Sequence, residues 1–143
     1  MMAVKGVRRL NVVATSVLLL SSCSGPTSVA ERVTRGLPDA LSETQLAEIT
    51  MKDPAAFWLD MGKTIALVTF GSSSCPAVVS SMEAIGTDTL KLRIDSSSGS
   101  GPCTADLTAT THELMVPISV AQRPVILTLS YPEGDASPPL VLD

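Results

Sequence analysis

The run Gly71-Ser72-Ser73-Ser74-Cys75-Pro76 and the lone His112 hold the side chains best suited to covalent chemistry in this chain of 143 residues. A serine hydrolase places its nucleophile in a G-x-S-x-G elbow, and here position 75 is cysteine in place of the second glycine. A catalytic triad would have to use His112, which falls within a segment that favours a β-strand. A single histidine on a strand is usually an ordinary surface or edge residue, and we predict this for His112. We therefore assign no catalytic residue.

A second chemical reading concerns Cys75. Residues 68–76 resemble the strand followed by Cys-Pro that opens a thioredoxin-like site, and Arg123-Pro124 before a later strand adds to the resemblance. The resemblance implies that the Cys75 thiol is reactive, because a cysteine at a helix N-terminus has a lowered pKa. Two features depart from the family: Val78 stands where the second cysteine belongs, and residues 96–112 offer no helix. A thioredoxin-like thiol–disulfide protein that uses Cys75 is the enzymatic alternative.

The structure of segment 76–85 bears on this alternative, and the sequence leaves it open. Val78, Val79, Met82 and Ile85 recur at helical spacing, and Pro76 suits the first turn of a helix. Val78, Met82 and Ala84 would equally share one face of a strand.

Metal-binding patterns are weak in this chain. There is no C-x-x-C pair, and one histidine cannot complete a Cys/His zinc site with two widely spaced cysteines. The stretch from Asp95 to Asp106 lacks the repeated acids that give a calcium loop its carboxylate ligands. We predict no metal site and no cofactor.

The N-terminus carries an export signal. One lysine and two arginines precede the apolar run Leu10–Leu20, which is about half the ~20 residues that a bilayer-spanning helix needs. The run ends in Leu20-Ser21-Ser22-Cys23, which resembles the lipobox of bacterial lipoproteins. In that family a peptidase cleaves before the cysteine, whose thiol carries a diacylglyceryl group. The resemblance implies a signal peptide over residues 1–22 and a lipidated, palmitate-type anchor on Cys23.

The charge of the chain fits a protein held at a membrane by lipid. Cleavage before Cys23 would remove three of the ten basic residues and none of the 14 acidic ones, which leaves a net charge of −7. An acidic body does not bind nucleic acid, which requires a clustered basic face, and an anionic membrane would repel it. We predict a membrane partner through the lipid on Cys23, at the extracytoplasmic face of the cell membrane. A protein or small-molecule ligand is not identified by the sequence.

If Cys23 is lipidated, two of the three cysteines remain, Cys75 and Cys103. Disulfides persist in exported proteins, so we predict a bridge between these two residues. Closing a loop of this length contributes roughly 3–4 kcal/mol in the chain-entropy model.

The remaining pattern predicts a tether followed by an all-β domain. Residues 23–53 have a tether composition, and Ser42-Glu43-Thr44-Gln45 forms a capping box that predicts one short helix around 40–50. Residues 54–143 contain short apolar or alternating runs separated by turn signals, which is typical of a small antiparallel sandwich, immunoglobulin-like, with six or seven strands. The predicted strands cover 64–70, 89–95, 104–116, 125–131 and 140–142.

Residues 54–116 also resemble a group of small uncharacterised lipoproteins of Gram-positive bacteria. The resemblance rests on Trp58-Leu59, on the run 71–76 and on Cys103-Thr104-Ala105-Asp106. It implies a disulfide-linked β body and supplies no activity. We expect a surface-exposed, non-enzymatic binding or envelope-accessory module.

Overall fold

The computed structural model describes residues 25–97, 101–134 and 137–143. The predicted signal peptide over 1–22 and the predicted lipidation site Cys23 lie outside these residues. Within them, no helix is long and apolar enough to span a membrane. The described residues form these elements: β1 (Arg32–Arg35), α1 (Glu43–Glu48), β2 (Ala55–Asp60), β3 (Thr64–Gly71), β4 (Ala77–Ala84), β5 (Thr89–Ser96), β6 (Thr108–Met115), β7 (Val125–Ser130) and β8 (Leu140–Leu142).

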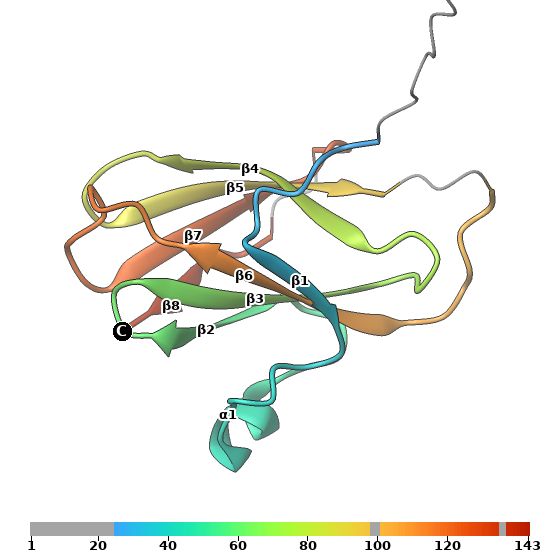
Figure 1. Ribbon diagram of the computed structural model, residues 1–143, viewed down its shortest axis with the longest axis horizontal. Helices are drawn as coiled ribbons and strands as arrows, with labels where there is room; N and C mark the ends of the chain where they lie inside the picture. Colours follow the sequence, from blue (N-terminus) through green and yellow to red (C-terminus); the bar gives the residue numbers. More distant parts are fainter. Residues whose placement is uncertain (1–24, 98–100, 135–136) are drawn as a thin grey trace, which may run out of the picture.

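The strands form two four-stranded sheets, with orders β1-β6-β3-β2 and β4-β5-β7-β8 (Figure 1). Neighbouring strands are antiparallel except β5 and β7, which are parallel. The parallel pair arises because β6 lies in the other sheet, so the chain leaves β5, crosses over and returns in the same direction. The predicted small all-β sandwich with one disulfide is confirmed, and its second sheet is mixed.

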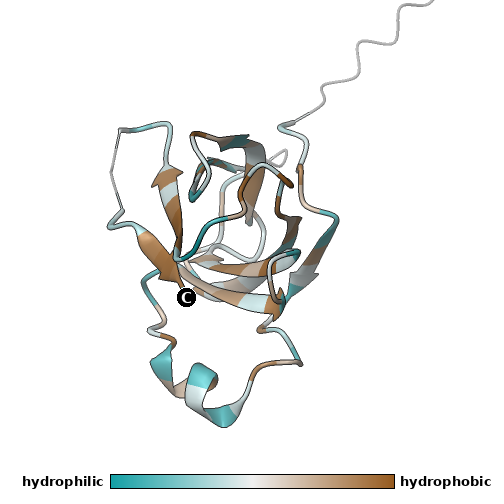
Figure 2. Cartoon of the chain, turned by 90° about the vertical axis from the view of Figure 1, so that its left-hand side faces the viewer, coloured by the Kyte–Doolittle hydropathy of each residue, from teal (hydrophilic) through white to brown (hydrophobic). Residues whose placement is uncertain are grey.

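The core lies between the two sheets and follows from the alternation of side chains along each strand. In β5, Leu90, Leu92 and Ile94 are buried while Lys91 and Arg93 are exposed, as the sequence predicts for a half-buried strand. Figure 2 views the sandwich from one end, and apolar colouring runs along its strands. The principal buried side chains of the core are Ile65, Leu67, Val79, Leu90, Leu92, Leu114, Val125, Leu127 and Leu129.

Segment 76–85, which the sequence left open, is strand β4 up to Ala84. Its apparent helical spacing has a local cause. The pairing with β5 shifts between Val79 and Ser81, and this β-bulge inserts one extra residue. Val79 and Met82 therefore both face the core although they are three residues apart, as on a helix.

The predicted tether contains a strand that the sequence did not predict. All four residues of β1 are exposed, yet they pair with β6 from Arg32–Glu113 to Arg35–Thr110. The Val29 N–H also donates a 2.8 Å hydrogen bond to the Val79 carbonyl of the opposite sheet. The β domain thus begins near Val29 rather than at residue 54. An edge strand with arginine at both ends has no apolar alternation to reveal it, and its pairing depends on β6.

The predicted helix is present as α1, between β1 and β2 (Figure 1). The Ser42 side chain accepts a hydrogen bond from the Gln45 N–H, and the Gln45 side chain accepts one from the Ser42 N–H, which completes the capping box. No residue of α1 is buried, and the helix is mostly hydrophilic in Figure 2. The chain just before it, at Leu37 and Pro38, lines a cavity of about 350 Å³ with Thr111 of β6.

Candidate functional site

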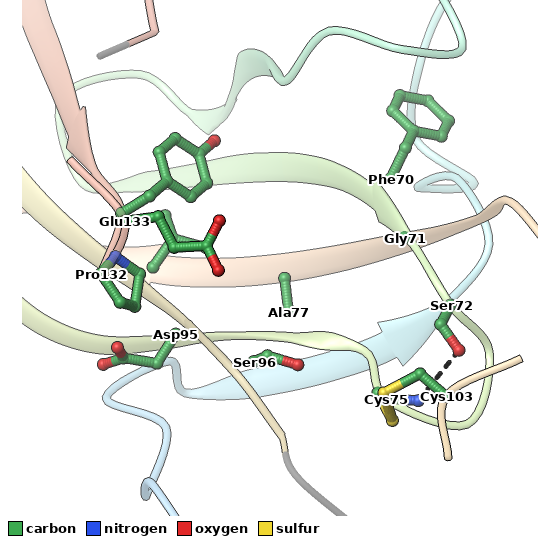
Figure 3. Close-up of a pocket in the computed structure, with 12 residues that line it drawn as sticks. Phe70, Gly71, Ser72, Cys75, Ala77, Asp95, Ser96, Cys103, Pro132 and Glu133 are labelled. Carbon is green, nitrogen blue, oxygen red and sulfur yellow. Dashed lines mark hydrogen bonds between the residues drawn. A yellow bond between two sulfur atoms is a disulfide. The ribbon is translucent and has the colours of Figure 1, made fainter. Parts of the chain in front are cut away.

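A pocket of about 550 Å³ opens at the end of the sandwich where β3, β5 and β7 finish and β4 begins (Figure 3). Its volume falls within the range of small-molecule sites, about 300–1,000 Å³. β5 and β7 are parallel and therefore finish at the same end of their sheet, beside the pocket. Its lining consists of Phe70, Gly71, Ser72, Cys75, Ala77, Ile94, Asp95, Ser96, Cys103, Tyr131, Pro132 and Glu133.

The lining is largely apolar and contains two of the four aromatic residues of the chain. Phe70 comes from the end of β3 and Tyr131 directly follows β7. Tyr131 packs against the core, and burial raises the pKa of its phenol, so the hydroxyl stays protonated at neutral pH. Ile94 and Ala77 form the sheet side of the pocket. These residues can hold an apolar body.

The two carboxylates of the lining differ in their surroundings. Asp95 accepts hydrogen bonds from the hydroxyl of Ser80 and from Nε of Arg93, which lies 3.2 Å away. The hydrogen bond from Ser80, with a smaller effect of Arg93, lowers the pKa of Asp95. Glu133 is exposed and forms no salt bridge within the described part of the chain. In Figure 3 its carboxylate extends toward the middle of the pocket, while that of Asp95 turns away.

The predicted disulfide between Cys75 and Cys103 is present and forms one wall of the pocket. It joins the β3–β4 loop to the β5–β6 loop, with the two Cα atoms 5.4 Å apart. Cys75 is buried, with 6% of the residue's surface exposed. The strands that flank these two loops are paired at Gly71–Thr108 and at Ala77–Ser96, and the bridge joins the loops themselves.

Polar contacts reinforce this junction. The Ser73 N–H donates a 3.1 Å hydrogen bond to Asp106, and the Thr104 N–H donates one of 2.9 Å to the Ser74 hydroxyl. Hydrogen bonds from Ser73 and Thr104 hold the pKa of Asp106 far below its usual range, so Asp106 is ionised. The hydroxyl of Ser72 lies 2.8 Å from that of Thr104. The serine-rich run thus uses its hydroxyls to fix the loop.

His112 is not at the surface, and the prediction of a surface or edge position was wrong. Its side chain is fully buried in the core, opposite Leu67 of β3. Its hydrogen-bonding contact in the described residues is with the Thr69 hydroxyl, 3.1 Å from Nε2. Burial lowers the pKa of His112 to about 4. The imidazole is therefore neutral at pH 7 and makes no hydrogen bond to the serine-rich run.

The thioredoxin-like alternative needs a helix that starts after Cys75. The chain instead enters β4 at Ala77, and Cys75 is bonded to Cys103. The arrangement that would lower the pKa of this thiol at a helix N-terminus is absent from these described residues.

The described residues contain no group of three or more His, Cys, Asp or Glu side chains that could hold a metal ion. Asp95 and Asp106, the two ends of the stretch compared with a calcium loop, bond to different partners, Ser80 and Ser73. Residues 98–100 of that stretch lie outside the described residues.

Sequence reasoning found the disulfide wall of the pocket and missed its aromatic and acidic lining. Phe70 precedes Tyr131 and Glu133 by about 60 residues in the sequence. The available signal was positional: an aromatic residue closes each of the two strongest strand patterns, at Phe70 and at Tyr131.

No protein-family model, curated protein or solved structure matches this chain.

Proposed function

We propose that this protein is a lipid-anchored, extracytoplasmic binding module without catalytic activity, and that the pocket beside the disulfide receives its ligand. The anchor is inferred from Leu20-Ser21-Ser22-Cys23 and from the basic and apolar residues before it. Two acyl chains give lasting attachment, because each buried CH₂ contributes about 0.8 kcal/mol. Eight residues separate Cys23 from the start of β1 at residue 32, which is enough for a short spacer.

The observation that carries the binding role is the pocket itself. It combines an apolar lining with a few polar groups, which is the usual composition of a small-molecule site. One of its walls is the disulfide. The disulfide and the contacts of Asp106 hold the loops in place before any ligand arrives. A site that is already formed lowers the entropic cost of binding.

The lining gives less support to catalysis. Cys75 and Cys103 are oxidised, and Asp95 is engaged by Ser80 and Arg93. The one imidazole, that of His112, lies in the core and does not line the pocket. A nucleophile within hydrogen-bond reach of a base, the usual sign of covalent catalysis, is not found among the described lining residues.

The test is to titrate ¹⁵N-labelled protein with a panel of small cationic, neutral and anionic molecules that carry an apolar body. The proposal expects backbone signals of Ala77, Ile94 and Glu133 to shift together and to saturate. Signals at the opposite end of the sandwich, such as Gly62, serve as an internal control. If compounds bind with no shift at the pocket, or if none binds, the pocket is not the ligand site and the proposal fails.

A further inference from the structure

The pocket has a charge pattern that selects among ligands. Its ionisable carboxylates are Asp95 and Glu133, and neither lysine nor arginine is among its described lining residues. Arg93 already lies 3.2 Å from Asp95 and offsets its charge. Glu133 is the carboxylate left to interact with a ligand, and its side chain extends into the hollow in Figure 3.

An aromatic ring strengthens the same preference. Tyr131 packs against the core and lines the pocket that contains Glu133, whereas the ring of Phe70 points away from Ala77 and the disulfide in Figure 3. The faces of aromatic rings carry negative charge density and attract cations, as a carboxylate does. An anionic ligand would be repelled by the negative charge of Glu133, which no lysine or arginine of the described lining offsets. A neutral ligand would gain only the apolar contacts.

Resting on the proposed function, we infer that the ligand is a small organic cation, an apolar body that carries one ammonium group. The apolar body would lie against Ile94, Ala77 and the ring of Tyr131, and the ammonium group would face Glu133. The volume of about 550 Å³ accommodates a molecule larger than an inorganic cation. Because Glu133 is solvent-exposed, its attraction for the ammonium group is screened by salt.

The test uses three probes with a common apolar body: phenylpropylammonium, phenylpropanol and phenylpropionate. Dissociation constants are measured by NMR titration at low ionic strength. The ammonium probe is expected to bind about 10-fold more tightly than the alcohol, which corresponds to about 1.4 kcal/mol. The carboxylate is expected to bind most weakly, and the preference for the ammonium probe should decrease as salt is added.

Two variants attribute the preference to one side chain. Glu133→Gln keeps the shape of the side chain and removes its charge, so the preference for the ammonium probe over the alcohol should fall to the smaller part that an aromatic ring supplies. Glu83→Gln makes the same change at an exposed position of β4 that does not line the pocket, and it should keep the wild-type ratio.

The outcomes separate this inference from the proposed function. If the alcohol shifts the pocket signals and binds as tightly as the ammonium probe, the cation preference is wrong and the binding site stands. If Glu133→Gln keeps the 10-fold ratio, the assignment to Glu133 is wrong. If no probe shifts the pocket signals, both the inference and the proposed binding site fail.

Discussion

The hydroxyl of Thr69 lies 3.1 Å from Nε2 of His112 inside the sandwich, and it also donates a 3.4 Å hydrogen bond to the carbonyl of Thr110. The direction of the contact between Thr69 and His112 depends on which imidazole nitrogen carries the proton. With either tautomer, Nδ1 has no hydrogen-bond partner in the described structure. A second proton on this ring would create a buried charge without a partner.

This arrangement predicts that the protein loses stability in mild acid. The pKa of His112 is about 4 in the folded protein against 6.5 for an ordinary histidine, so the unfolded chain takes up a proton first as the pH falls. The free energy of unfolding should therefore decrease by about 2 kcal/mol between pH 7 and pH 5, at about 1.4 kcal/mol per unit of pH below 6.5. Urea denaturation at several pH values measures this change.

The matched variant is His112→Gln, which removes the titrating ring and keeps a polar side chain. Its stability at pH 7 will differ from that of the wild type, but its free energy of unfolding should be nearly constant between pH 7 and pH 5. A variant that retains the full wild-type loss would show that another group is responsible.

The disulfide should contribute to stability as a structural bridge does. Cys75 and Cys103 are 28 residues apart, so the double variant with alanine at both positions should lose roughly 3–4 kcal/mol of unfolding free energy by the chain-entropy model. Denaturant titration measures the loss. The bridge should also resist a glutathione buffer, as structural disulfides with potentials below about −300 mV do.

A redox-active bridge would behave differently. It would be reduced readily, Cys75 would then react fast with alkylating reagents at neutral pH, and the double variant would lose little stability. That combination would favour the thiol–disulfide alternative over the binding module.

The proposed lipid anchor predicts a defined mature protein. Material extracted from membranes should begin at Cys23, carry acyl groups on that residue and partition into the detergent phase. Cys23→Ala should leave an uncleaved precursor. Intact-mass measurement decides the matter, because a mature N-terminus without acyl mass on Cys23 would contradict the anchor.

The sequence predicted those parts of the fold that local pattern determines. The alternation over 89–95 and the apolar runs over 64–70 and 125–131 became β5, β3 and β7 within one residue at each end. The Ser42–Gln45 capping box located α1.

The parts that were missed depend on partners distant in sequence. β1 is a strand because β6 supplies hydrogen bonds to its exposed backbone. His112 is buried because its strand lies inside sheet β1-β6-β3-β2, a position that a threonine-rich segment does not reveal. The helical spacing over 76–85 reflected the bulge between Val79 and Ser81. The pocket escaped detection because it forms where three strand ends meet, so no continuous segment encodes it.

The binding role is tested most directly by filling the pocket. Gly71 lines it, its φ is not in the left-handed region, and a Cβ added there meets no atom within 4 Å. Gly71→Leu should therefore fold and place its side chain in the space the ligand needs. Gly25→Leu is the matched control, since its added Cβ also meets nothing within 4 Å and it lies outside the pocket.

The decisive measurement is the affinity of the phenylpropylammonium probe for the wild type and these two variants, by isothermal titration calorimetry. We expect at least about a 10-fold loss for Gly71→Leu, the equivalent of about 1.4 kcal/mol, and an unchanged affinity for Gly25→Leu. Equal affinity of all three proteins, with Gly71→Leu folded by circular dichroism, would contradict the claim that this pocket is the binding site.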